Sequence, residues 1–272
     1  MFTILFLFLI IGLICGIFSG MLGLGGALIA VPMMLWILPL LHIPSATLAH
    51  IAFGTSLSIV CLNGLSASYH HIRNGSLNWR ISTLLAPGIG LGALLGSALG
   101  SQLNKTFLTL FLAAVIVVIL VRSFRTASTK TAAHMTSHAR MPNKFVAGPF
   151  SVLAGLSGSL NGGGCATYIN PYLKHHGYKM DTCSAQSSLL SSIVAFIGAV
   201  TYIVAGLGAP SLPTGSVGFI YLPGALVAVV AGFPATRLGN WLRQSMSDSF
   251  AYSIFLTILA ISLVTTLSSL IF

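Results

Sequence analysis

The sequence predicts an all-α polytopic membrane protein made of two inverted repeats, each with five apolar segments. Of its 272 residues, 56% are hydrophobic and 5% are charged, whereas roughly 25% are charged in soluble domains. Apolar stretches long enough to cross a bilayer recur along the chain, without the polar and apolar alternation of a membrane β-barrel. A glycine-rich run also occurs twice, about half the chain apart, and it divides the segments into two sets.

The repeated run reads Ser-Gly-Met-Leu-Gly-Leu-Gly-Gly at 19–26 and Ser-Gly-Ser-Leu-Asn-Gly-Gly-Gly at 157–164. Glycine costs about 1 kcal/mol relative to alanine in a helix interior. Each run therefore predicts a point where a membrane helix stops, unwinds and restarts. Matched breaks in two halves of a membrane protein are typical of a ligand site.

The first half contains the apolar segments 2–19, 24–41, 47–69, 79–100 and 107–121. The first segment lacks Lys and Arg, unlike a cleavable signal peptide, so we expect it to be retained. The second contains Pro32, and the third ends before an Arg-Asn-Gly turn at 73–75. The fourth has a glycine at every fourth position from Gly88 to Gly100, which predicts a helix-packing stripe.

Residues 122–144 form the predicted linker, because they are rich in Lys and Arg and show no apolar periodicity. The second half contains the segments 145–160, 165–173, 182–207, 217–236 and 249–272. Residues 165–173 make only about 14 Å of helix, half the thickness of a bilayer. The predicted repeats therefore occupy 1–121 and 145–272.

Further matches between the halves keep their order along the chain. Thr55-Ser56-Leu57 corresponds to Ser187-Ser188-Leu189, and Pro87-Gly88 corresponds to Pro223-Gly224. We therefore interpret one half as a duplicate of the other.

An odd number of segments in each half places the two halves in opposite orientations. With the linker in the cytoplasm, alternation of sides leaves only Lys105 of the 12 Lys and Arg residues outside, as the positive-inside rule favours. We therefore expect a multi-pass protein of the cell (inner) membrane with both termini outside. Topology then explains the net charge of +10, and we expect no nucleic-acid partner.

The first two segments of each half fit either two crossings or one re-entrant hairpin, since both return the chain to the same side. The short second arms, with Pro32 and Pro171, favour hairpins whose glycine tips meet near the midplane. Unwound backbone is tolerated there only where it is buried in protein or lines a watery cavity.

The sequence resembles the TauE/SafE sulfite exporter family. The resemblance rests on the glycine spacing from Gly16 to Gly26 followed by Pro32, its second copy at 155–164 with Pro171, and the motifs at 55–57 and 73–75. It implies transport of small sulfur-containing or organic anions, such as sulfite, sulfoacetate, thiosulfate or related sulfonates. The chain departs from the repeated pattern at Asn161, which stands where the first copy has Gly23, and at Cys165.

The residue chemistry also favours an anion. A helix that begins after a glycine tip presents free backbone N–H groups and the positive end of its dipole. Hydroxyl and amide side chains nearby donate hydrogen bonds without adding negative charge. The candidate substrate-binding residues are Ser19, Gly23, Gly25, Gly26, Thr55, Ser56, Ser157, Asn161, Gly163, Gly164, Cys165, Gln186 and Ser187, with Thr167, Asn170 and Ser188 nearby.

Other interpretations stay open at this point. The glycines also suit close helix packing, and a lone hydroxyl in a membrane helix often bonds its own preceding turn. The only carboxylate side chains are Asp181 and Asp248, so Na⁺, H⁺ or no ion are the alternatives for coupling, and a channel would use the same dipoles. We expect no catalysis, cofactor or metal, because Cys165 and Cys183 lack an acid or histidine partner in the pattern. The sequence leaves the oligomeric state open.

Overall fold

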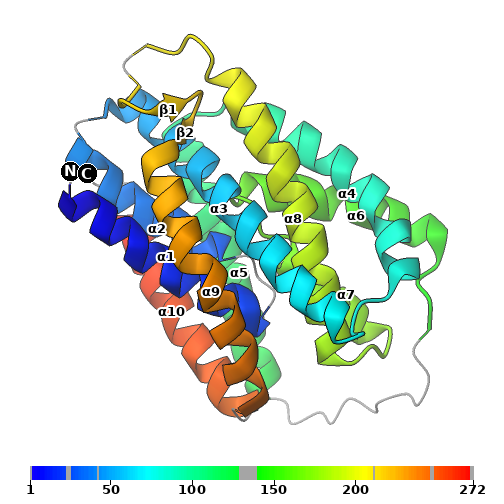
Figure 1. The fold of residues 1–272 in the computed structure, drawn as a ribbon. Helices are drawn as coiled ribbons and strands as arrows, with labels where there is room; N and C mark the ends of the chain where they lie inside the picture. Colours follow the sequence, from blue (N-terminus) through cyan, green and yellow to red (C-terminus); the bar gives the residue numbers. More distant parts are fainter. Residues whose placement is uncertain are drawn as a thin grey trace.

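The computed structural model describes residues 2–22, 26–41, 43–128, 140–210, 212–245 and 248–269. These residues form a helical bundle with one small β-hairpin (Figure 1). The helices of the first half are α1 (Phe2–Leu22), α2 (Ala27–Ile37) with a 3-10 turn at Leu38–Leu41, α3 (Ser45–Arg73), α4 (Trp79–Gly100) and α5 (Lys105–Ser128). Those of the second half are α6 (Lys144–Leu160), α7 (Ala166–His175), α8 (Met180–Ala205), α9 (Leu222–Ser245) and α10 (Asp248–Ser268), with strands β1 (Ser216–Val217) and β2 (Ile220–Tyr221) before α9.

Several helix ends follow directly from local sequence. The side chain of Asn78 accepts a hydrogen bond from the Arg80 amide at 3.1 Å and caps the start of α4. Asn143 caps α6 in the same way through the Phe145 amide, at 3.2 Å. Such caps satisfy amides that lack an intrahelical acceptor. At the end of α3, Gly75 has a φ of 67°, which lets the chain turn toward α4.

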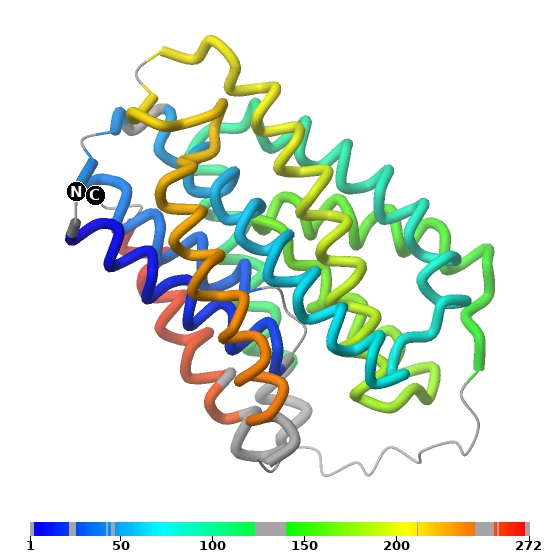
Figure 2. Tube along the Cα trace, viewed as in Figure 1, coloured from blue at the N-terminus to red at the C-terminus, as the bar shows by residue number. Residues whose placement is uncertain are grey.

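The two halves pack on each other through pairs of helices, with one helix of each pair from each half. The helix α1 runs along α9, and α6 runs along α4, so the first helix of each half packs on the fourth helix of the other (Figure 2). The helices α3 and α8 pack on each other, and they also contact α9 and α4 respectively. This arrangement places α3 and α8 at the centre of the bundle.

Glycines make these close helix pairs sterically feasible. A methyl group added at Gly92 would overlap the Val152 carbonyl of α6, and one added at Gly155 would overlap the Ile89 carbonyl of α4. Gly88 and Gly96 also face α6, which confirms the predicted packing stripe, and Gly100 at its end lies beside the Tyr202 hydroxyl. Small residues serve this purpose between membrane helices.

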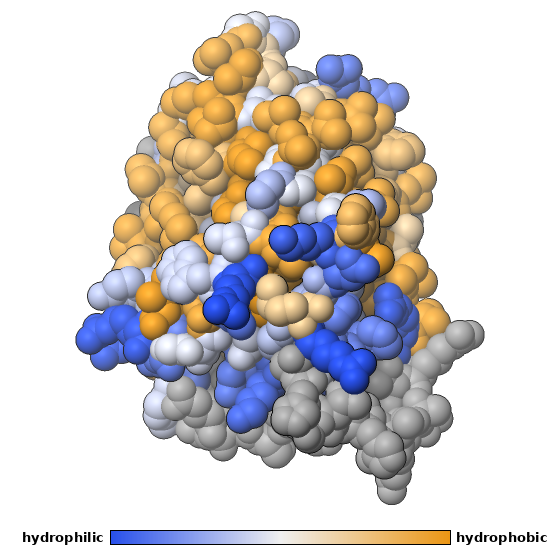
Figure 3. Space-filling model, turned by 90° about the vertical axis from the view of Figure 1, so that its right-hand side faces the viewer, coloured by the Kyte–Doolittle hydropathy of each residue, from blue (hydrophilic) through white to orange (hydrophobic). Residues whose placement is uncertain are grey.

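Six of the described helices are long and apolar enough to cross a membrane. They are the helices at Thr3–Met21, Thr47–Arg73, Trp79–Gly100, Lys105–Arg122, Met180–Ala205 and Leu222–Leu242. On the face shown in Figure 3, hydrophobic residues form a broad area and hydrophilic residues gather mainly toward the lower end. The mostly helical, polytopic class predicted from composition is therefore confirmed.

Positive side chains gather at one end of the bundle, which we call the basic end. The turn between α3 and α4, the connection from α7 to α8 and residues 140–143 meet there, since the Arg140 amide donates to the His176 carbonyl at 3.1 Å. Arg237 lies close enough to His70 to act on it electrostatically, together with Arg73. The cations of this end with described side chains are Arg73, Arg80, Arg122, Arg140, Lys144, Lys174, Lys179 and Arg237.

Some predicted boundaries differ from the structure. The last but one helix begins at Leu222 rather than at 217, because Ser216–Tyr221 forms a β-hairpin around Gly218, whose φ is 54°. The helix α5 continues beyond 121 to Ser128, and α9 continues beyond 236 to Ser245. The predicted linker therefore overlaps the end of α5, and its residues 129–139 lie outside the described part.

Candidate functional site

The second glycine run is a genuine helix break. Between the end of α6 and the start of α7, residues 161–165 are not helical, and all of them are buried. Gly162 has a φ of 83° and Gly163 a φ of 114°, and both values belong to a region that L side chains rarely adopt. The Gly163 amide donates to the Gly158 carbonyl at 2.9 Å and closes the end of α6. We call residues 161–165 the second tip.

The first run also separates two helices, since α1 ends at Leu22 and α2 begins at Ala27. Gly26 has a φ of 78°. Its carbonyl accepts the amides of Ile29 at 3.1 Å and Ala30 at 2.9 Å, and the Cys15 thiol at 3.6 Å. Gly23 and Gly25, two of the predicted site residues, lie outside the described residues. We call residues 23–26 the first tip.

The second tip contacts helices of the first half. The Ser56 hydroxyl of α3 donates to the Gly162 carbonyl at 3.2 Å. The Cα of Gly162 faces Val31 of α2, while Gly163 faces Leu57 of α3 and Ala195 of α8. The second tip is therefore enclosed by the helix that follows the first tip and by the two central helices.

Hydroxyl, amide and thiol groups surround this tip. The Asn161 amide lies 3.4 Å from the Tyr168 hydroxyl, which also bonds the Ser157 side chain. The Cys165 amide donates to the Ser191 hydroxyl at 3.2 Å, and the Cys165 thiol lies 3.3 Å from the same oxygen. These contacts bring Ser56, Ser157, Asn161 and Cys165 to one place.

Two polar atoms at the second tip are buried without a partner among the described residues. They are Oδ1 of Asn161 and Oγ1 of Thr167, which lies in the first turn of α7. Buried polar atoms are normally paired, and leaving one unpaired costs about 1–3 kcal/mol. The α7 amides at 166 and 167 precede the first intrahelical bonds, which run from Tyr168 and Ile169 to the Cys165 carbonyl. These side-chain atoms and amides, which have hydrogen bonds still to make, therefore lie at the positive end of the α7 dipole.

Other predicted residues make different contacts. Thr55 accepts the Tyr221 amide at 3.0 Å and so holds the β-hairpin. Gln186 donates to the Asn78 carbonyl at 2.6 Å, and Ser187 donates to the Ser184 carbonyl of its own helix at 3.1 Å. The hydrogen bonds of these three side chains lie away from the second tip.

The remaining predicted residues are small and buried. Gly164 lies within the second tip. Ser19 lies near the end of α1, and its buried hydroxyl has no partner among the described residues.

Sequence reasoning missed three polar residues. Tyr168 and Ser191 contact the second tip directly, and only the folded structure brings them there. Asn63 on α3 is fully buried against Gly232, and neither of its amide atoms has a partner in the described part of the chain. A carboxamide in the middle of an apolar membrane helix is itself a signal for function, and it was visible in the sequence.

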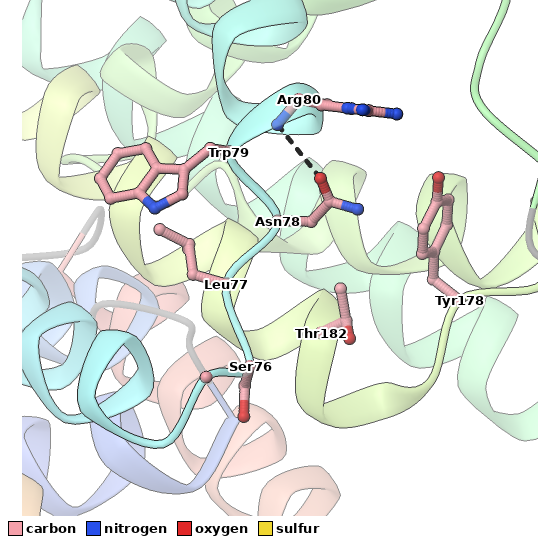
Figure 4. A pocket seen from close by; sticks show the side chains of 8 residues that line it. Ser76, Leu77, Asn78, Trp79, Arg80, Tyr178 and Thr182 are labelled. Carbon is pink, nitrogen blue, oxygen red and sulfur yellow. Dashed lines mark hydrogen bonds between the residues drawn. The ribbon is translucent and has the colours of Figure 1, made fainter.

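A cavity of about 470 Å³ opens at the basic end. Figure 4 shows Tyr178 and Thr182 across from Asn78 and Arg80, which belong to the turn between α3 and α4 and the start of α4. Burial raises the pKa of Tyr178 above its ordinary value, so its phenol stays a neutral donor. The residues that line the cavity are Gly75, Ser76, Leu77, Asn78, Trp79, Arg80, Tyr178 and Thr182.

The family model described as sulfite exporter TauE/SafE matches residues 8–266. The chain belongs to this family. Both glycine tips and the described part of every helix from α2 to α9 fall within the matched range. The resemblance stated from the glycine spacing is therefore confirmed, and the family is one of membrane transporters.

The relatives of this TauE/SafE chain are described as probable membrane transporter proteins. A probable membrane transporter protein of Haemophilus influenzae is 26% identical over 266 residues, covering 97% of this chain and 99% of the relative. One of Methanocaldococcus jannaschii is 22% identical over 244 residues, covering 89% and 87%. One of Bacillus subtilis is 26% identical over 85 residues, or 31% of each chain. No solved structure matches the chain.

Proposed function

We propose that the protein is a secondary transporter that moves small sulfur-containing or organic anions, such as sulfite, sulfoacetate or thiosulfate, by alternating access. The observation that carries this proposal is the second tip, where buried unpaired polar atoms meet the positive end of α7. A desolvated site with this polarity favours an anion. The family description, sulfite exporter, supports the substrate class.

Asn161 and Thr167 are the proposed donors to the substrate, together with the first amides of α7. The Thr167 hydroxyl has no partner among the residues that the structure describes, so it can donate. The two ends of a carboxamide are interchangeable by rotation. Turned over, Asn161 accepts from the Tyr168 hydroxyl through Oδ1 and directs its NH₂ group toward an anion. Because Gly163 and Gly164 have no side chains, the backbone of the second tip can approach the anion closely. Ser56 and Ser157 hold the second tip in place through their hydrogen bonds.

We propose that the first tip contributes the other half of the site, through Ser19, Gly23, Gly25 and Gly26. The exchanged packing of α1 on α9 and of α6 on α4 supports two inverted repeats. In such a protein the two hairpins are related by a pseudo-twofold axis in the membrane plane, and their tips face a shared site. The burial of residues 161–165 corresponds to a conformation in which this site is closed to water.

The distribution of charge supports a cytoplasmic basic end and outer termini, in the cell membrane. Among cations with described side chains, Lys105 follows the far end of α4, whereas Arg73 and Arg80 flank its near end. There are 2 acidic residues. Asp181 interacts electrostatically with His71 at the basic end, and Asp248 is the first residue of α10. This arrangement does not favour a proton relay of buried carboxylates, so we propose Na⁺ coupling or uniport.

The test is uptake by proteoliposomes that contain the purified protein, with labelled sulfite, sulfoacetate and thiosulfate. We expect saturable uptake of at least one of these anions above that of empty liposomes. Imposed Na⁺ and proton gradients, applied separately, identify the coupling ion. Absence of uptake for all the sulfur anions would refute the substrate class, and flux that rises without saturation would replace the transporter by a channel.

A further inference from the structure

The cavity at the basic end faces the outside of the protein and carries positive charge. Arg80 lies on its wall, and Lys179 follows the cavity residue Tyr178. The nearest acid in sequence, Asp181, interacts electrostatically with His71. A volume of about 470 Å³ is within the range of small-molecule sites, roughly 300–1,000 Å³. The cavity therefore suits a small hydrated anion.

Buried polar side chains follow one another along α8 from the cavity to the level of the second tip, and we call this run of residues the polar path. Thr182 lines the cavity, and Ser191 bonds Cys165. The rise of a helix places these two residues about 14 Å apart. Between them α8 buries four polar side chains together with the apolar Cys183, Ala185 and Leu190; the four are Ser184, Gln186, Ser187 and Ser188.

Gln186 lies on α8 one turn beyond Thr182. It is fully buried, and it joins α8 to the start of α4 by two hydrogen bonds. Its Nε2 donates to the Asn78 carbonyl at 2.6 Å, and its Oε1 accepts from the Ser82 hydroxyl at 2.7 Å. Since Asn78 also lines the cavity, the Gln186 bridge is attached directly to the cavity wall.

We propose that the basic-end cavity is the site where the anionic substrate is first admitted, and that the Gln186 bridge is the gate between this cavity and the second tip. This inference rests on the proposed function, because it assigns a path to the same substrate. Arg80 attracts the anion, and release of Gln186 from Asn78 and Ser82 opens the seam between α4 and α8. The freed Gln186 amide then donates to the passing anion in place of the lost bonds.

Cys165 is a natural reporter of this gate, since its buried thiol lies at the inner end of the path. The test uses protein in which Cys15, Cys61 and Cys183 are replaced by Ala, in sealed vesicles of known orientation. The reagents are two membrane-impermeant methanethiosulfonates, one carrying a sulfonate and the other a trimethylammonium group. The rate of Cys165 labelling measures access and does not depend on transport.

We expect Gln186→Ala to raise the labelling rate from the basic end about tenfold, as befits the loss of two hydrogen bonds. Arg80→Gln should slow the sulfonate reagent more than the cationic one. Ser66→Ala is the matched control, because it removes a 2.8 Å bond between α3 and α9 away from the path, and its rate should equal that of the parent. If Gln186→Ala does not fold, Ser82→Ala removes one of the two bonds and should give a smaller rise.

Unchanged labelling in both Gln186→Ala and Ser82→Ala, or faster labelling only from the opposite end, would overturn the gate. Equal slowing of both reagents by Arg80→Gln would overturn the role of the cavity in attracting anions. The proposed function can fail independently of the gate. If Cys165 is labelled as predicted but no sulfur anion is taken up, the path to Cys165 stands and the proposed substrate class is rejected.

Discussion

The substitution Thr167→Val isolates one donor of the proposed site. Valine has nearly the shape of threonine, and both are β-branched, so the first turn of α7 keeps its packing. What changes is Oγ1, a buried oxygen without a partner among the described residues. The substitution therefore removes a hydroxyl that makes no hydrogen bond within the described part of the chain but donates to the proposed anion.

The two expected effects have opposite signs. An unpaired buried hydroxyl costs about 1–3 kcal/mol, so Thr167→Val should leave the melting temperature unchanged or raise it. A hydrogen bond to a charged group contributes about 1.5–3 kcal/mol, which corresponds to a loss of roughly 10- to 150-fold in substrate affinity. A structural role for Thr167 would instead lower stability and affinity together.

The assay combines thermal unfolding in detergent with initial rates of anion uptake over a range of concentrations. Thr83→Val is the matched control, because the Thr83 hydroxyl is exposed on α4 and bonds the Trp79 carbonyl of its own helix at 3.0 Å. We expect wild-type uptake from Thr83→Val and an increased KM from Thr167→Val. Wild-type KM in Thr167→Val would refute the assignment of this donor.

Three further predictions concern the breaks and the packing. Gly92→Ala places a methyl group on the Val152 carbonyl and should abolish cooperative unfolding. Gly148→Ala is the control, because an added methyl group there meets no atom within 4 Å, and it should keep the wild-type melting temperature. Equal melting curves for the two variants would contradict the α4–α6 contact. Gly163→Ala forces an L residue to a φ of 114° and should cost about 1–3 kcal/mol in thermal unfolding, and an unaltered curve would argue against the strained tip. Asn63→Leu removes a buried amide without a partner among the described residues, so its melting temperature should hold or rise, and a marked fall would mean that the amide is bonded in the empty protein.

The features that the sequence predicted share a local cause. Breaks at both tips follow from the poor helix propensity of glycine and from its tolerance of positive φ, as at Gly26 and Gly162. The packing stripe from Gly88 follows from a four-residue spacing that needs no knowledge of the partner helix. Composition alone was sufficient for the membrane class.

The features that the sequence did not predict depend on tertiary contacts. Val217, Ile220 and Tyr221 are apolar and lie directly before α9, so their sequence predicts a continuation of that helix. The β-hairpin forms instead, and the hydrogen bond from the Tyr221 amide to Thr55 holds it. Gln186 has the composition of a site residue, but its partners Asn78 and Ser82 lie on a helix distant in sequence. Ser191 reaches the second tip only because α7 folds back along α8.

An experimentally determined structure of the protein with bound sulfoacetate or sulfite tests the central claim most directly. The account predicts density for the anion at the second tip, within hydrogen-bonding distance of the Thr167 hydroxyl, the Asn161 amide and the first amides of α7. Saturating anion that occupies only sites away from residues 161–167, with the tip unchanged, would contradict it.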